Sequence, residues 1–399
     1  MCPSYMATRE EAHSTRGRAH LLWEMLEGKS IHDGWRSNEV KEALDLCLAC
    51  KACKTECPVN VDLATYKAEF LAHHYEGRMH PLRDYAFGFM DKSAHLASAV
   101  PGVSSWAANA VMQAPVLRSV IKKFAGVAPA RTLPRFASRS FQSQQKQAPS
   151  GDKALPPVLL WPDTWNNYFH PQSLSAARDV LRAAGFRIVL PKGHICCGRP
   201  LYDFGFLKHA RIYLDRVMQL LAPQIDAGMP FVILEPSCAS VFRDELLNFF
   251  PDDTRAQKLS RQTFLLSEFL VKHAPAYQPP SLVDRRIVLH GHCHHKSLLK
   301  MNDELTLLRA TGAEVEYLDS GCCGMAGPFG FEKEKFEVSQ AIGERVLLPA
   351  VRGAAAATIL VTDGFSCREM IAQNTDRRAI HFAEAICGQV NSSAPPSRS

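Results

Sequence analysis

Thirteen cysteines are the residues of this 399-residue chain that are most able to do chemistry, because thiolates bind metals and take part in redox reactions. Twelve of them fall into three groups: five within residues 1–66, three between 196 and 238, and four between 293 and 367. No secretory signal is recognisable at the start of the chain. Grouped cysteines in such a chain predict metal ligands in a reducing, cytoplasmic setting rather than disulfides.

The first group contains the spacing C-x2-C-x2-C-x3-C-P, formed by Cys47, Cys50, Cys53 and Cys57 with Pro58. Bacterial ferredoxins hold a [4Fe–4S] cluster with this run, and two-residue gaps let one loop supply three corners of the cube. In two-cluster proteins the fourth cysteine binds the other cluster. A zinc site is the alternative reading, because C-x2-C also suits zinc.

A second cysteine–proline pair, Cys2-Pro3, stands at the start of the chain. It resembles the end of another such run whose first three cysteines are absent, which predicts a chain truncated inside its ferredoxin region. In that case Cys2 completes the cube of Cys47, Cys50 and Cys53. The alternative is that Cys2 is incidental and that Cys57 closes its own loop.

The segment from 158 to 387 repeats itself, which predicts an internal duplication. Cys196-Cys197-Gly198 matches Cys322-Cys323-Gly324 at an offset of 126 residues, and Cys238 matches Cys367 at an offset of 129. Apolar segments match in the same order: 158–162 with 287–291, 184–190 with 311–318, and 231–238 with 358–367. Short β-branched runs alternate here with helical stretches, which indicates βαβ units and parallel sheets.

The cysteines of each repeat follow predicted strands, and ligands of parallel sheets bind at the carboxyl ends of strands. We therefore expect four thiolates to converge on one metal site in the second repeat: Cys293, Cys322, Cys323 and Cys367. The first repeat has three candidate ligands, Cys196, Cys197 and Cys238, with Thr164 at the place of Cys293. These three thiolates could leave an open corner, share a cluster between the repeats, or hold nothing.

For several other residues, the sequence favours or leaves open a role that does not involve metal binding. His290, His292, His294 and His295 surround Cys293, and we expect mostly solvated loop histidines, with ligands or hydrogen-bond donors to sulfur as the alternative. Cys387 fits neither repeat and is expected to be a core cysteine. Arg9, Arg16 and Arg18 could orient the ferredoxin loops or simply form a solvated helix face.

The predicted fold class is α+β/α/β, a helical ferredoxin-like [4Fe–4S] domain followed by two duplicated α/β cysteine-rich domains with parallel sheets. Apolar residues make up 46% of the chain and charged residues 22%, which excludes general disorder. The net charge of +6 gives no argument for nucleic acid, and no apolar run could span a bilayer. The predicted parts are a ferredoxin-type domain (1–66), a helical connector (67–141), a linker (142–157), two cysteine-rich domains (158–276 and 277–390) and a tail (391–399).

The CCG repeats downstream of the ferredoxin-type run resemble the cysteine-rich domains of heterodisulfide reductase. They are also similar to the iron–sulfur subunits of anaerobic glycerol-3-phosphate dehydrogenase and of glycolate and lactate oxidases. A narrower likeness rests on CPSYMATREEAHSTRGRA at 2–19, HGHCH at 290–294 and GFSCR at 364–368. These segments look like the C-terminal iron–sulfur half of FAD-linked 2-hydroxyacid dehydrogenases of the D-lactate and D-2-hydroxyglutarate type.

The resemblance implies an iron–sulfur electron-transfer module that needs a flavin domain, which this chain lacks, on the same polypeptide or on a partner. It implies a quinone, cytochrome or thiol as the acceptor, and a chain in the cytoplasm or peripheral at the inner face of the membrane. No residue is assigned a catalytic role. Related domains hold a non-cubane cluster with a final C-x2-C, which Val241 and Met370 interrupt here. Two alternatives remain open: a thiol–disulfide reductase of the heterodisulfide type and a zinc-binding structural protein.

Overall fold

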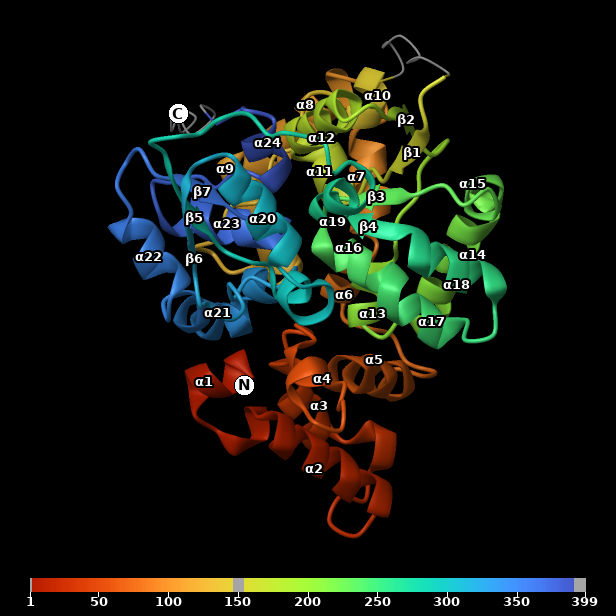
Figure 1. Ribbon diagram of the computed structural model, residues 1–399. Helices are drawn as coiled ribbons and strands as arrows, with labels where there is room; N and C mark the ends of the chain where they lie inside the picture. Colours follow the sequence, from red (N-terminus) through yellow and green to blue (C-terminus); the bar gives the residue numbers. More distant parts are fainter. Residues whose placement is uncertain (1, 146–153, 391–399) are drawn as a thin grey trace.

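The computed structural model describes residues 2–145 and 154–390 of the chain. Figure 1 shows a helical N-terminal part below two α/β units that lie side by side, with further helices behind them. The predicted tail over 391–399 lies outside the described residues, as does most of the predicted linker. Of that linker, residues 142–145 end a helix and residue 157 begins a strand.

The N-terminal part is a group of short helices with its own small core, formed mainly by Met25, Ile31, Val40, Leu44 and Phe70. Side-chain oxygens cap three of the helices, because they accept hydrogen bonds from otherwise unpartnered N–H groups of the first turn. The helices are α1 (Pro3–Thr8), α2 (Thr15–Glu27), α3 (Asn38–Asp45), α4 (Ala52–Glu56) and α5 (Leu63–His74), with the 3-10 turns η1 (Glu11–His13) and η2 (Gly34–Arg36).

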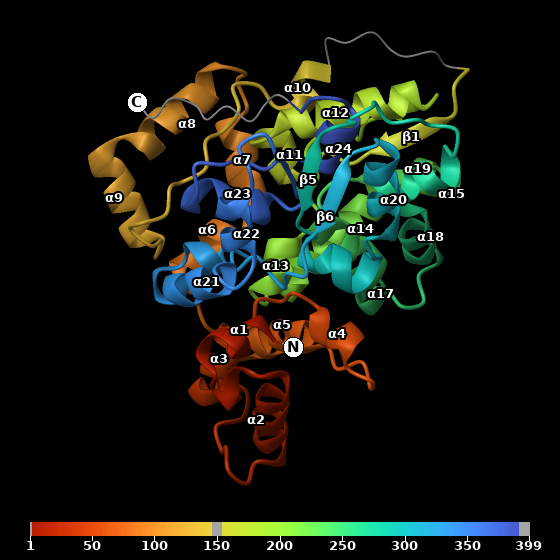
Figure 2. The same cartoon turned by 60° about the vertical axis from the view of Figure 1, so that its left-hand side comes forward.

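A group of helices follows the N-terminal part. Pro115 separates α8 from α9, because it has no N–H to continue the first helix and instead begins the second. Figure 2 shows α8 and α9 at the outer edge of the molecule. The connector helices are α6 (Leu82–Gly88), α7 (Met90–Ala97), α8 (Val103–Gln113), α9 (Pro115–Phe124) and α10 (Phe141–Gln145).

The first repeat contains a fully parallel sheet in the order β2-β1-β3-β4. Its strands are β1 (Pro157–Leu160), β2 (Arg187–Val189), β3 (Phe231–Ile233) and β4 (Thr263–Leu265). Its helices are α11 (Thr164–Tyr168), α12 (Pro171–Ala183), α13 (Arg199–Asp203), α14 (Leu207–Leu220), α15 (Ala222–Asp226), α16 (Pro236–Ser240), the π-helix η3 (Val241–Glu245), α17 (Leu246–Phe249), α18 (Thr254–Gln262) and α19 (Leu266–His273).

The second repeat has a parallel sheet in the order β6-β5-β7, so its three strands match β2, β1 and β3 in sequence and in place. At the position of β4, this repeat has a single parallel bridge between Val361 and Ile380. Its strands are β5 (Arg286–Leu289), β6 (Glu314–Tyr317) and β7 (Ile359–Val361). Its helices are the π-helix η4 (His295–Leu299), α20 (Asn302–Ala310), η5 (Phe329–Phe331), η6 (Lys333–Lys335), α21 (Phe336–Gly343), α22 (Leu347–Gly353), α23 (Phe365–Asn374) and α24 (Phe382–Ile386).

One apolar core joins the two repeats. Buried residues of β1 and β3, such as Leu160 and Val232, belong to the same cluster as Leu289 of β5 and Val361 of β7. Helices α12 and α24 pack against each other within this core. The shared core fixes the two sheets relative to each other, and with them the loops that carry the cysteines.

Candidate metal centre

Four cysteines of the N-terminal part gather around the ferredoxin-type loop. Left-handed residues at Ala49 (φ 50°) and Lys51 (φ 62°) curl this loop around Cys50. Burial raises the pKa of the Cys53 thiol to about 11, and the nearby charges of Cys47 and Cys2 add to the rise. Burial also raises the pKa of Cys50, which Cys2 and Cys47 influence in the same way. The raised pKa values of Cys50 and Cys53 show that negative charges on these thiols would repel one another, and a bound cation would offset that repulsion.

Cys2 is held in this group by Arg18. The guanidinium donates to Cys2 Sγ at 2.9 Å, to Ser4 Oγ at 2.8 Å and to the carbonyl of Ala43 at 2.7 Å. Burial alone would raise the pKa of Cys2, but the positive charge of Arg18 and local hydrogen bonds hold it below its usual value. Of the three arginines singled out in the sequence, Arg18 is buried and orients a cysteine, whereas the side chain of Arg16 is 90% exposed.

Cys57 lies apart from the other four. Backbone N–H groups of Val61, Val59 and Asn60 lower the pKa of its thiol, and within the described residues no cysteine contributes to this shift. The structure thus brings together Cys2, Cys47, Cys50 and Cys53, and it leaves Cys57 outside the group.

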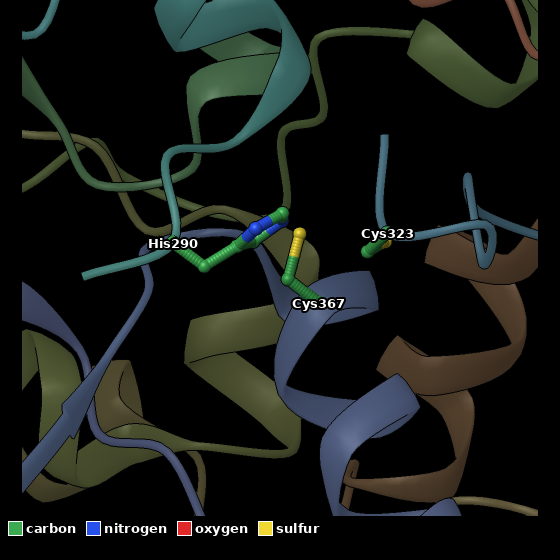
Figure 3. A group of neighbouring side chains, drawn as sticks. All are labelled: His290, Cys323 and Cys367. Atoms are coloured by element: carbon green, nitrogen blue, oxygen red, sulfur yellow. The ribbon is translucent and has the colours of Figure 1, made fainter. Parts of the chain in front are cut away.

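The four cysteines of the second repeat form a chain of thiol contacts. Cys322 lies close enough to Cys293 and Cys323 for their thiols to shift its pKa, and Cys323 likewise lies close to Cys367 and His290. Figure 3 shows His290, Cys323 and Cys367, whose ligand atoms lie within 4.8 Å of one another. The neighbouring thiols of Cys322 and Cys367 lower the pKa of Cys323, although burial opposes this. The strand-end loops therefore converge in the way that the parallel topology predicted.

The CCG glycine of this repeat is required by its geometry. Gly324 has a φ of 89°, which side-chain-bearing residues rarely adopt. A Cβ at this position would lie 2.3 Å from the carbonyl oxygen of Ser339. Glycine therefore lets the loop turn sharply beside Cys322 and Cys323 while α21 packs against it.

The four histidines around Cys293 are buried, so the expectation of solvated loop histidines was wrong. Their segment is packed between the second sheet and the ferredoxin-type loop, and His294 Nε2 contacts the carbonyl of Ala49 at 2.8 Å. Burial lowers the pKa of His292 to about 3, which keeps this ring neutral. His290 bonds to Ser320 Oγ through Nδ1 at 2.7 Å, and its Nε2 is buried without a hydrogen-bond partner beside Cys323. His290 is thus a fifth candidate ligand in the second repeat.

The first repeat gathers three thiols and a hydroxyl. Cys197 Sγ lies 3.1 Å from Cys238 Sγ, and Thr164 Oγ1 donates to Cys196 Sγ at 3.8 Å. A hydrogen bond with Cys197 lowers the pKa of Cys238, but burial outweighs it and raises the value to about 12. Thr164 therefore occupies the place that Cys293 has in the second repeat. Cys387 lies elsewhere, partly buried against the shared core.

The cysteine groups approach one another at two places. Cys293 is near enough to Cys50 for its charge to raise the pKa of Cys50, and Ser297 Oγ donates to the carbonyl of Cys50 at 3.3 Å. A cavity that is partly open to solvent is lined by cysteines of both repeats: Cys196, Cys197, Cys238 and Cys293. Its other walls are largely apolar and include Met112, Leu133 and Phe136 of the connector, which sequence reasoning did not connect with the site.

Comparison with known families identifies the parts that carry these cysteines. A family model described as a 4Fe-4S dicluster domain matches residues 1–61, and one described as a cysteine-rich domain matches twice, over 164–242 and 287–372. The chain joins a 4Fe-4S dicluster domain to two cysteine-rich domains. The predicted duplication, fold class and iron–sulfur cofactors are therefore confirmed. The gathered thiols are the donor set that such clusters require.

Curated relatives are similar to this chain over more than half of its length. The chain is 28% identical to D-2-hydroxyglutarate dehydrogenase of Pseudomonas putida, with 97% of this chain and 41% of the relative covered. It is 28% identical to a subunit of the anaerobic glycerol-3-phosphate dehydrogenase of Escherichia coli, with 63% and 64% covered. It is also 28% identical to lactate utilization protein A of Bacillus velezensis, with 53% and 90% covered. The chain thus spans about two fifths of the length of the D-2-hydroxyglutarate dehydrogenases.

Proposed function

We propose that this chain is the iron–sulfur electron-transfer module of an FAD-linked 2-hydroxyacid dehydrogenase of the D-lactate or D-2-hydroxyglutarate type. The approach of Cys50 to Cys293 carries the proposal, because it places two cysteine groups in succession. Bound iron–sulfur clusters would supply one-electron transfer. The relatives are named as a dehydrogenase and as a dehydrogenase subunit, which supports a substrate-oxidising domain as the source of electrons. We propose that this domain bears a flavin and lies upstream on this polypeptide or on a partner.

We propose an order in which electrons pass through the two cysteine groups. Cys2, Cys47, Cys50 and Cys53 would hold a [4Fe–4S] cluster on the flavin side, with Arg18 donating a hydrogen bond to sulfur. Cys293, Cys322, Cys323 and Cys367, with His290 beside them, would hold the next one. A protein sets the reduction potential of such clusters through their burial and through hydrogen bonds to sulfur.

The cavity between the repeats favours a small apolar acceptor. Aromatic side chains such as Phe136, Trp165 and Phe365 line it beside the cysteines, and ligand pockets are typically lined in this way by apolar and aromatic side chains. A quinone ring fits such walls, whereas a cytochrome could reach only the outer surface. We therefore propose a quinone as the acceptor.

Helices α8 and α9 support a location at the inner, cytoplasmic face of a membrane. Within the described residues, no helix has the length and apolar character needed to cross a bilayer. The α8–α9 pair instead exposes large apolar side chains, including Trp106 (71% exposed) and Phe124 (73% exposed), beside the basic Arg118 and Lys123. Apolar side chains with flanking positive charge are typical of helices that lie in the headgroup region of anionic lipids.

Vesicle sedimentation tests this location. We expect the chain to pellet with phosphatidylglycerol vesicles and much less with phosphatidylcholine vesicles, because basic residues add attraction to anionic lipid. The double variant Trp106→Ser, Phe124→Ser should stay in the supernatant. The control is Ile212→Ser, which removes an exposed apolar side chain from α14. Equal pelleting of the double variant would contradict the membrane location.

Anaerobic purification followed by iron, sulfide and zinc analysis tests the electron-transfer function. At least about four irons per chain are expected, with an EPR signal after chemical reduction. The substitution Cys50→Ala should abolish the ferredoxin-type signal, whereas Cys387→Ala should leave it unchanged, because Cys387 lies away from the groups. Stoichiometric zinc at the cysteines without sulfide would contradict the proposal. Faster reoxidation by a disulfide than by a quinone would favour a thiol–disulfide reductase instead.

A further inference from the structure

A second type of donor cluster lies in the second repeat and contains no cysteine. It consists of His295, Glu304 and Asp363, which are 1%, 1% and 4% exposed. His295 begins the π-helix η4, Glu304 lies in the first turn of α20, and Asp363 follows β7. His295 Nδ1 is 3.2 Å from Glu304 Oε2 and 3.6 Å from Asp363 Oδ2, and the three donor atoms all lie within 4.8 Å of one another.

Polar atoms of this group are buried without hydrogen-bond partners. Among the described residues, neither ring nitrogen of His295 has a partner with hydrogen-bond geometry, and neither does Glu304 Oε2. Each unsatisfied buried group costs about 1–3 kcal/mol, so several together require a physical explanation. Within this group of two carboxyl groups and one imidazole, the atoms that can accept a hydrogen bond outnumber the protons that can be donated.

The third donor, Asp363, is oriented by contacts to its other carboxylate oxygen. Asp363 Oδ1 accepts from the backbone N–H of Phe382 at 3.2 Å and lies 3.3 Å from His381 Nε2. His381 Nδ1 accepts from the N–H of Ala383 at 2.9 Å, which leaves the ring proton on Nε2. These contacts hold one carboxylate oxygen and leave Oδ2 aimed at His295. Outer contacts of this kind orient the ligands of metal sites.

We propose that His295 Nδ1, Glu304 Oε2 and Asp363 Oδ2 bind a single divalent metal ion, with zinc as the ion that best suits the set. Zinc accepts imidazole nitrogen and carboxylate oxygen at about 2.0–2.2 Å, and a dication balances two buried carboxylates. This site differs from the cysteine groups in using no thiol.

The ion would position two cysteine-bearing loops. His295 lies two residues after Cys293, and Asp363 lies four residues before Cys367. A metal bound to both residues and to α20 would tie the loop after β5 to the loop after β7. Its role is structural, and no electron transfer through it is required.

Zinc K-edge absorption on the full-length, zinc-loaded chain tests the assignment without any substitution. We expect about one zinc per chain with only nitrogen and oxygen neighbours near 2.0–2.2 Å, and no sulfur near 2.3 Å. A sulfur shell would place the zinc at the cysteines and would overturn the proposal. Failure of zinc to bind at all, in competition with a chelator of micromolar affinity, would also overturn it.

Substitutions then locate the ion. Glu304→Gln keeps the shape of the side chain and removes its charge, so zinc affinity should fall more than about 100-fold, beyond the loss typical of an outer contact. Asp303→Asn is the matched control, since this carboxylate is the neighbour of Glu304 on α20 and lies outside the group. Unchanged zinc affinity in Glu304→Gln would contradict the site. Iron and sulfide content measured on the same samples separates this result from the proposed electron-transfer function.

Discussion

Arg18 sets the charge around the candidate ligand Cys2. Its guanidinium is buried and touches Cys2 Sγ, so the thiol pKa is lowered even though burial opposes this. The substitution Arg18→Met should therefore raise the pKa of Cys2. A raised pKa means less thiolate at a given pH, and alkylation of Cys2 in the metal-free chain should shift to higher pH.

Peptide mapping after timed iodoacetamide treatment follows Cys2 separately from the other cysteines. Arg16→Met is the matched control, because Arg16 lies two residues away with a largely exposed side chain. Its pH profile should equal that of the unchanged chain. Identical profiles for Arg18→Met and the control would refute a role for Arg18 in activating Cys2.

Cys53 and Cys57 allow a second residue-level comparison. Both belong to the ferredoxin-type run, but the pKa of Cys53 responds to Cys47 and Cys2, whereas only backbone groups lower that of Cys57. We expect Cys53→Ala to lose the cluster at this site and Cys57→Ala to retain its iron and sulfide. Iron, sulfide and EPR analysis of both variants decides this, and loss of the cluster in Cys57→Ala as well as in Cys53→Ala would show that Cys57 is a ligand.

Single residues differ in how far the sequence reveals them. The cysteine groups could be predicted, because fixed spacings and strand ends place thiols by local geometry alone. The burial of His294 could not, since it depends on a contact with Ala49, which is 245 residues away in the sequence. The role of Arg18 was left open for the same reason, because helix periodicity cannot show which face meets Cys2.

At the scale of elements, Lys51 docks the ferredoxin-type loop on the first repeat. It is completely buried just before α4, and its Nζ lies 2.7 Å from Asp62, 3.0 Å from Asp244 and 3.2 Å from Glu245. The last two residues belong to the π-helix η3. Burial lowers the pKa of Lys51, but these carboxylates outweigh burial and raise it, so the ammonium stays charged.

Lys51→Met should destabilise the chain by about 3–5 kcal/mol, because it leaves buried carboxylates without their partner. Lys54→Met is the graded control: Lys54 also pairs with Asp244, but it is partly exposed and should contribute about 0–1 kcal/mol. Urea unfolding followed by circular dichroism measures both. Equal effects of the two substitutions would show that burial of Lys51 does not anchor the loop.

The strands show which elements the sequence pattern predicts and which it misses. All six strands of the repeated pattern were placed correctly, because short apolar β-branched runs recur in the same order in both repeats. The fourth strand, β4, was missed. Its segment Thr263–Leu265 is only three residues long, and the matching place in the second repeat holds one bridge at Ile380, so no repeated signal marks it.

At the scale of the whole molecule, the shared core holds the two repeats so that their cysteine loops form one site. Because β1, β3, β5 and β7 contribute to the same apolar cluster, the cysteine loops of both repeats open onto one cavity. The duplication predicted two similar units, but their relative placement depends on packing between α12 and α24 and on connector residues such as Met112. Nothing in the local pattern of either repeat encodes that placement.

The cavity gives the prediction that tests the path of electrons through the whole molecule. Met112 lines the cavity from α8, away from the cysteine loops, and Met112→Trp should fill part of the space next to Phe136. Reoxidation of the reduced chain by a soluble quinone such as menadione should slow by about tenfold or more, equivalent to about 1.4 kcal/mol in the barrier. Reoxidation by ferricyanide, which needs no apolar pocket, should keep its rate.

Val111→Trp is the matched control, because the neighbouring Val111 lies exposed on the same helix and does not line the cavity. Stopped-flow bleaching of the iron–sulfur absorbance measures both oxidants on all three chains. Equal quinone rates in Met112→Trp and Val111→Trp would place the acceptor outside the cavity, whereas a slowing confined to quinone would place it between the two cysteine-rich repeats.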